Sequence, residues 1–174
     1  MLYADEASQS VCPSLSRTYA LKGKPPTITI STEISARLYL ASAIGANGEM
    51  DFMIRNKPFD SAAIIEFLKH LLETFNKKLI IIWDGASIHH SALIKSFLKK
   101  LPENQLYLVQ QPRYSPELNA DEQVWAYLKN YKLKNTCNHN VKELFPKINK
   151  ALVDMKNDKA LIASFFHHPN LSFL

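Results

Sequence analysis

Three acidic residues stand at the boundaries of predicted elements, and they are the first candidates for chemistry. Asp5 ends a short apolar run, Asp84 directly follows the most hydrophobic run of the chain, and Glu122 begins a helix after a proline-bounded loop. In sheets covered by helices, sites gather at strand ends and helix starts. Three carboxylates that meet there cannot all remain charged and unpaired, so they share protons or bind cations.

Oxygen ligands of this kind favour Mg²⁺ or Mn²⁺ over zinc, and no quartet of histidines and cysteines competes with them. Two such ions about 3.5–4 Å apart activate water and stabilise the leaving oxygen in phosphodiester cleavage. Each acid also has a structural interpretation. Asp84 alone suits a turn or a helix cap, Glu122 suits the positive end of a helix dipole, and Asp5 next to Glu6 suits an exposed surface.

The surrounding elements change from strands to alternating helices and strands. Apolar and β-rich runs predict strands at 2–4, 17–21, 27–32, 37–44 and 50–55, with Asn47-Gly48 suiting a tight hairpin turn. Helical periodicity and buried-strand runs then alternate, as helix 61–75 with Asp60 or Ser61 as its cap, strand 79–83, helix 91–101, strand 106–109, and helices 122–132 and 141–155. This order predicts an α/β fold with a mixed sheet flanked by helices, similar to the ribonuclease-H-like fold.

Two sequence blocks carry a resemblance to a known family. Residues 84–89, DGASIH, resemble the D-N/G-A-x-x-H block of DDE transposases, and residues 112–125, PRYSPELNADEQVW, resemble their P-x-Y-S-P-x-L-N-P-x-E-x-x-W block. Asp5-Glu6 matches a short opening D-E block, and Lys129 falls where the third block ends in L-K. Residues 1–174 therefore resemble a single catalytic domain of the DDE superfamily endonucleases, in the bacterial insertion-sequence branch of the Tc/mariner transposases.

The resemblance implies a metal-dependent DNA endonuclease and strand transferase with a ribonuclease-H-like fold. By position, the catalytic residues would be Asp5, Asp84 and Glu122. These three carboxylates would hold two metal ions, either Mg²⁺ or Mn²⁺. Between Asp84 and Glu122 lie 37 residues, slightly more than the family pattern, and Ala120 replaces its proline. The alignment of the block favours Glu122 as the third ligand over Asp121, which we interpret as a charge at the start of the helix.

Four further residues are candidates for contact with DNA. Lys129 lies two helical turns after Glu122, on the same face of a regular helix, so it can reach a phosphate or be an ordinary solvated lysine. Arg113 and Tyr114 lie on the loop before that helix. His89 can orient a carboxylate, touch a phosphate or be an ordinary hydrogen-bonded histidine. We expect Trp125 to pack in the core.

The family resemblance also sets expectations about partners. Its members usually carry N-terminal helix-turn-helix domains, and here Asp5 follows only four residues, so we expect that region to be absent, with a separately encoded helix-turn-helix subunit as one candidate to supply it. DNA, as element ends and target, is the expected partner, with a homodimer on DNA. The alternatives are a catalytically inactive fragment that binds DNA or dimerises, and a ribonuclease-H-type nuclease.

Composition agrees with this picture without establishing it. The chain has 174 residues, 47% of them hydrophobic, which suits one globular domain. We expect no membrane span, because no apolar window of about 18 residues occurs, and two cysteines make no disulfide framework, so a cytoplasmic protein associated with the bacterial nucleoid is expected. The net charge of +5 comes entirely from residues 123–174, which hold eight lysines and three acids; a solvated helix face explains this as well as an acidic partner does.

Overall fold

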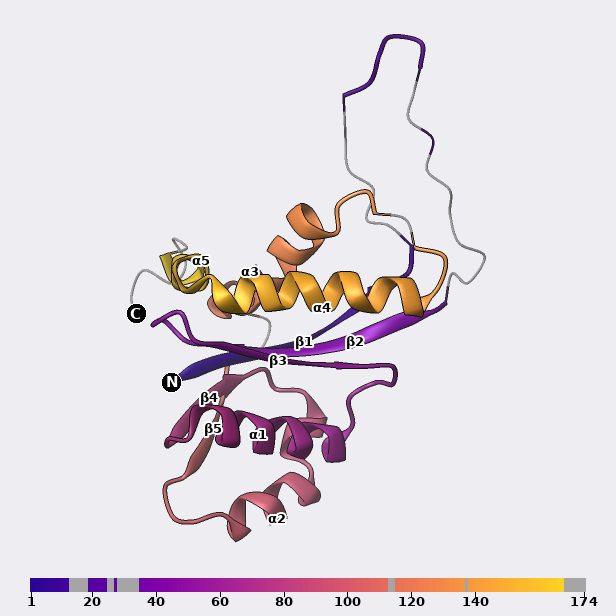
Figure 1. Cartoon of the computed structure of the whole chain (residues 1–174). Helices are drawn as coiled ribbons and strands as arrows, with labels where there is room; N and C mark the ends of the chain where they lie inside the picture. The colour runs from indigo at the N-terminus through magenta and orange to yellow at the C-terminus, as the bar shows by residue number, and fades with distance from the viewer. Residues whose placement is uncertain (13–18, 25–26, 28–34, 113–114, 137, 168–174) are drawn as a thin grey trace.

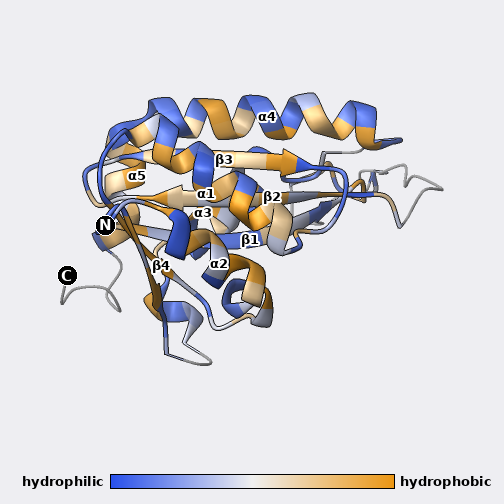
Figure 2. Cartoon of the chain, turned by 90° about the horizontal axis from the view of Figure 1, so that it is seen from below, coloured by the Kyte–Doolittle hydropathy of each residue, from blue (hydrophilic) through white to orange (hydrophobic). Residues whose placement is uncertain are grey.

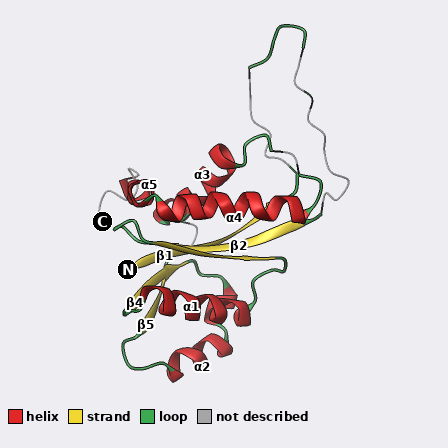
Figure 3. Ribbon diagram, in the orientation of Figure 1, coloured by secondary structure: helices red, strands yellow, loops and turns green. Residues whose placement is uncertain are grey.

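The described part of the chain folds around a mixed sheet of five strands (Figure 1; Figure 3). The computed structural model describes residues 1–12, 19–24, 27, 35–112, 115–136 and 138–167. The strand order is β3-β2-β1-β4-β5, in which β1, β2 and β3 pair antiparallel and β4 and β5 extend the sheet in parallel with β1. The strands are β1 (Leu2–Ser10), β2 (Arg37–Ile44), β3 (Met50–Arg55), β4 (Leu79–Trp83) and β5 (Leu106–Gln110).

Helices cover both faces of this sheet and create two cores. On one face lie α1 (Ser61–Phe75), η1 (Ser87–His90) and α2 (Ala92–Lys100), and their core includes Leu68 and Trp83. On the other lie α3 (Glu122–Tyr127), η3 (Leu128–Lys132), α4 (Val141–Asn157), α5 (Lys159–Ser164) and η4 (Phe165–His167). Figure 2 shows β4 as a mainly hydrophobic strand, as expected of a strand near the middle of a covered sheet. Within the described residues, no helix is long and apolar enough to cross a membrane.

Local sequence signals fix most of the helix boundaries. The Asp60 carboxylate accepts the Ala63 N–H at 2.8 Å and caps α1, as predicted, while Ser91 caps α2 in the same way through Ile94 N–H. Asn140 caps α4 through the Glu143 N–H. Such caps satisfy backbone donors that have no partner within the helix. The predicted helices at 61–75 and 141–155 are therefore confirmed within two residues.

Several elements differ in length or type from the expectation, although the helix predicted at 122–132 has those bounds. The first strand does not end at Ala4, because β1 pairs with β2 through Ser10, and this pairing overrides the low strand preference of its polar residues. The helix predicted at 122–132 changes to a π-helix at Leu128, where Leu133 N–H bonds to Leu128 O. Helix α5 was not predicted. Of the runs at 17–21 and 27–32, residues 19–21 and 27 are described and form no strand; the others lie outside the described residues.

A buried carboxylate joins the two helix layers at the β3 edge of the sheet. Asp51 is 2% exposed, and its Oδ1 accepts hydrogen bonds from Lys156 Nζ of α4 and from the Phe52 N–H, both at 2.8 Å. Its Oδ2 lies 3.2 Å from His70 Nε2 of α1. Burial raises the pKa of Asp51, but the hydrogen bonds from Lys156, Thr74 and Phe52 outweigh burial and hold that pKa below its ordinary value.

We predict that Gly48→Ala destabilises the fold more than Gly23→Ala does. Both glycines have positive φ, +79° and +82°, but a Cβ at Gly48 would lie 2.4 Å from Lys159 O, whereas a Cβ at Gly23 meets nothing within 4 Å. Strain alone costs about 1 kcal/mol, and the backbone clash adds to it only at Gly48. Urea unfolding of both variants measures the difference; equal losses would contradict the clash.

We predict that the stabilising contribution of Asp51 disappears in acid. A carboxyl group whose pKa is lowered by folding stabilises the native state above its unfolded pKa of about 3.8, and that contribution is lost as pH falls toward the folded pKa. The difference in free energy of unfolding between the wild type and Asp51→Asn should therefore be largest near pH 6 and shrink below pH 4. Urea titrations from pH 3 to pH 7 test this, and a difference independent of pH would refute it.

Candidate active site

Three carboxylates from separate elements line one cavity. Strands β1 and β4 are parallel with Tyr3 opposite Ile82, so the same register carried two residues on brings Asp5 beside Asp84, just past the end of β4. Glu122 is the first residue of α3. All three line a cavity of about 430 Å³. The other described residues lining it are Gly85, Ala86, Gln111, Pro112, Ser115, Pro116 and Asn119.

Asp5 lies within β1 rather than at its end, and a tryptophan holds its side chain. Trp125 Nε1 of α3 donates a hydrogen bond to Asp5 Oδ2 at 3.0 Å. Burial, followed by the negative charges of Glu122 and Glu6, raises the pKa of Asp5 to about 7. Trp125 is 3% exposed and packs in the core as predicted, but its contact with the first acid was not foreseen.

Asp84 is fixed through one oxygen. Its Oδ1 accepts the Ala86 N–H at 3.0 Å and lies 3.0 Å from His89 Nδ1. His89 Nδ1 is also 3.2 Å from the Asp84 carbonyl oxygen. The side chain of Asp84 is half exposed, at 52%, so this carboxylate is anchored on one side and open to the cavity on the other.

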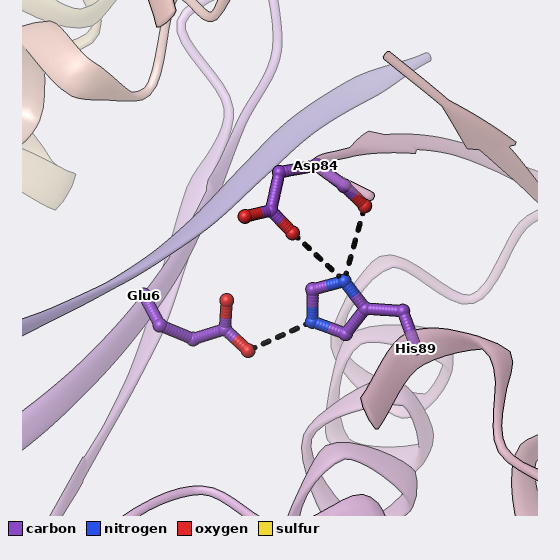
Figure 4. A group of neighbouring side chains, drawn as sticks. All are labelled: Glu6, Asp84 and His89. Atoms are coloured by element: carbon purple, nitrogen blue, oxygen red, sulfur yellow. Dashed lines mark hydrogen bonds and ion pairs between the residues drawn. The ribbon is translucent and has the colours of Figure 1, made fainter. Parts of the chain in front are cut away.

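His89 lies between two carboxylates (Figure 4). Its Nε2 is 2.9 Å from Glu6 Oε1, and its ring stacks at a tilt on Trp83, with centroids 4.3 Å apart. Burial lowers the pKa of His89, but the hydrogen bond and charge of Glu6 and the contacts with Asp84 outweigh burial and raise it. His89 therefore orients a carboxylate, which is one of the roles that the sequence left open.

Asp121 stands at the start of α3, as we interpreted it, but its burial was not predicted. It is fully buried, and its Oδ2 lies 2.6 Å from Ser42 Oγ of β2. Burial raises the pKa of Asp121 well above its ordinary value. It points to β2 and is not among the residues that line the cavity, whereas its neighbour Glu122 is.

Two amides in the loop before α3 place Glu122, and the sequence analysis assigned them no role. Asn119 Nδ2 donates to Ala4 O of β1 at 3.2 Å, and its Oδ1 accepts the Asp121 N–H at 3.1 Å. Gln111 Nε2 donates to Ser115 O at 2.9 Å. Both amides are buried. Asn119 stands inside the P-x-L-N part of the third block, so the block itself was the available signal.

The four candidates for DNA contact have different positions. His89 does not fit a phosphate contact, because its side chain is 3% exposed and both ring nitrogens face carboxylate oxygens. Lys129 lies in the π-helix, where the wider turn changes the expected two-turn alignment with Glu122. It does not line the cavity in the part of the chain that the structure describes. Arg113 and Tyr114 lie outside the described residues.

The donor set fits a hard divalent cation. Asp5, Asp84 and Glu122 offer only oxygen ligands, and burial, followed by the charges of Glu122 and Glu6, raises the pKa of Asp5. Among the described residues, no lysine or arginine lines this cavity to neutralise them. Oxygen-only sites with uncompensated negative charge suit Mg²⁺ or Mn²⁺.

Comparison with solved structures identifies the fold. The strand-transfer complex of Mos1 superposes with a TM-score of 0.71 at 14% identity, over 99% of this chain and 52% of that chain. The mariner Mos1 paired-end complex with Mg gives a TM-score of 0.70 at 15% identity, over 95% of this chain and 51% of that one. The catalytic domain of Mos1 mariner transposase gives 0.59 at 10% identity, over 99% and 80%. The predicted ribonuclease-H-like fold is therefore confirmed.

Sequence comparison identifies the family. An uncharacterized 39 kDa protein of the insertion element IS630 from Shigella sonnei is 28% identical over 130 residues, which are 74% of this chain and 37% of the relative. The chain thus spans well under half of that relative. The sequence profile of the DDE superfamily endonucleases matches residues 1–144 and so includes all three cavity carboxylates. The chain belongs to the DDE superfamily endonucleases.

Proposed function

We propose that this chain is the catalytic domain of a transposase of the Tc/mariner and IS630 type, which cleaves and rejoins DNA at the ends of an insertion sequence. The observation that carries the proposal is the meeting of Asp5, Asp84 and Glu122 around one cavity. Family membership and the likeness to Mos1 structures support it.

The three carboxylates would hold two ions of Mg²⁺ or Mn²⁺, which supply a nucleophilic water and stabilise the leaving oxygen when bound. The protein's own contribution is to present these carboxylates in fixed positions. Trp125 donates to Oδ2 of Asp5, and Ala86 and His89 contact Oδ1 of Asp84, so each carboxylate is held in place where it lines the cavity. A fixed geometry of this kind lowers the cost of reorganisation during the reaction.

DNA is the proposed substrate and partner. Lys129, with Arg113 and Tyr114 on the loop before α3, are the proposed contacts with its backbone, and the lysines of residues 123–174 add a positive field. Recognition of the element ends would come from a helix-turn-helix region that is separate from the described fold. Since two ends must be joined, a homodimer on DNA is the proposed assembly.

We predict that Asp5→Asn stabilises the metal-free protein at pH 8. Asp5 has a pKa of about 7 because burial and the charges of Glu122 and Glu6 oppose its ionisation, so removing the charge relieves repulsion while the amide oxygen can still accept from Trp125. A gain of at least about 1 kcal/mol corresponds to a Tm rise of roughly 2–4 °C in EDTA. Calorimetry measures it, with the exposed Glu73→Gln as the control that should leave the Tm unchanged.

Addition of Mn²⁺ to the same samples tests whether the Tm rise of Asp5→Asn comes from removing a negative charge at the proposed metal site. The cation should raise the Tm of the wild type more than that of Asp5→Asn, because it binds the charged site in the native state. An Asp5→Asn variant that is less stable than the wild type in EDTA, or equally stabilised by Mn²⁺, would contradict the proposed site.

We predict that Asp84→Asn and Glu122→Gln each lower DNA nicking by at least about 100-fold. Loss of a carboxylate ligand removes several kcal/mol of charge stabilisation, and each 1.36 kcal/mol is a factor of ten. The measurement is nicking of supercoiled plasmid in Mn²⁺, which needs no knowledge of the element ends. Glu117→Gln makes the same charge change on the exposed surface of the neighbouring loop and should keep full activity.

A parallel assay on an RNA–DNA hybrid distinguishes a transposase domain from a ribonuclease-H-type nuclease. Nicking of DNA without cleavage of the hybrid supports the proposal, and the reverse preference overturns it. Undiminished nicking by Asp84→Asn would show that the cavity carboxylates are not the catalytic groups.

A further inference from the structure

Glu6 points to the opposite face of the sheet from its neighbour Asp5. Successive residues of a strand alternate in direction, so Asp5 faces the layer of α3 and Glu6 faces the layer of α1 and α2. There Glu6 Oε2 accepts a hydrogen bond from Trp83 Nε1 at 3.0 Å, and Oε1 lies 2.9 Å from His89 Nε2. Both carboxylate oxygens are thus engaged by groups of the chain itself.

Glu6, Asp84 and His89 are close enough together to resemble a metal site, but their contacts argue otherwise. Their ligand atoms lie within 4.8 Å of one another. His89 is 3% exposed, and its Nδ1 faces Asp84 while its Nε2 faces Glu6. A metal ion there would have to displace these hydrogen bonds as well as the one from Trp83. Of the three, only Asp84 lines the cavity that Asp5 and Glu122 share.

The contacts form a chain that ends at a cavity carboxylate. Trp83 holds Glu6, Glu6 holds His89, and His89 holds Oδ1 of Asp84. The stacking of His89 on Trp83 fixes the plane of the ring, and Figure 4 shows this ring between Glu6 and Asp84. Trp83 is the last residue of β4 and immediately precedes Asp84. The end of β4 therefore anchors both the first and the last residue of this series of hydrogen bonds. Asp84 is the most exposed acid of the group, at 52%, and is the one that needs such support.

We propose that Glu6 is a positioning residue, which acts through His89 to fix Asp84 and does not itself bind metal. The inference rests on the proposed function, since it assumes that Asp84 is a metal ligand. Groups that hydrogen-bond to ligands orient them, and their loss typically weakens metal binding by about 10–100-fold. A glutamine in place of Glu6 keeps one acceptor oxygen for Trp83, but its amide group can pair with His89 only where Nε2 of the ring accepts instead of donating, and the negative charge beside the ring is removed.

The test is calorimetric titration of the metal-free protein with Mn²⁺ alone, with the Tm in EDTA measured for every variant. We expect Glu6→Gln and His89→Gln to weaken Mn²⁺ binding by about 10–100-fold, and the double variant to be no weaker than the weaker single variant, because the two side chains act as one unit. Trp83→Phe keeps the ring and removes the N–H, so a smaller loss is expected. His90→Gln, at the exposed neighbouring position, should bind Mn²⁺ as the wild type does.

The outcomes separate this inference from the proposed function. Asp84→Asn should bind Mn²⁺ more weakly than any of the positioning variants. If it does, and Glu6→Gln and Trp83→Phe bind as the wild type does, the positioning role is overturned and the metal site stands. If losses at Glu6 and His89 are additive and each equals that of Asp84→Asn, both are ligands and the inference is also wrong. If Asp84→Asn binds Mn²⁺ normally, the metal site itself is refuted, and positioning with it.

Discussion

Repulsion among carboxylates is the constraint around which this fold is arranged. Asp5, Asp84 and Glu122 converge on one cavity, and Asp121 lies directly beside them in the sequence and in the core. Negative charges this close oppose one another, and after burial the charges of Glu122 and Glu6 are the causes that raise the pKa of Asp5. Without fixed donors the flexible side chains would turn away from each other, so the site depends on hydrogen bonds that keep them in place.

Those donors come from both sides of the sheet, and the alternation of β1 explains why. Asp5 faces α3 and is held by one indole, from Trp125; Glu6 faces the other layer and is held by another, from Trp83. The parallel pairing of β1 with β4 then brings Asp84 next to Asp5, while Asn119 ties the start of α3 to β1. One short strand segment therefore connects all three elements of the site.

The sequence predicted the parts of this arrangement that depend on local pattern. Helix periodicity located α1 and α2, with Asp60 as one of the two predicted caps of α1, and the motif blocks located the three cavity acids. What depended on tertiary contact was missed. The length of β1 depends on its pairing with β2, and the buried position of Asp121 depends on its contact with Ser42. The π-helix that begins at Leu128 has no local sequence signal that we can name. The roles of Glu6 and Trp83 required knowing which face of the sheet each side chain occupies.

Asp121 shows how two adjacent acids are kept in different environments at the start of α3. A charged carboxylate with no exposure and one hydroxyl partner is unfavourable, so burial raises the pKa of Asp121 well above its ordinary value. The hydrogen bond that Ser42 Oγ donates to Asp121 Oδ2 joins the start of α3 to β2. The chain thus separates two adjacent acids by their environment, with Asp121 buried against the sheet and Glu122 lining the cavity, and the two cores on opposite faces of the sheet supply the packing around them.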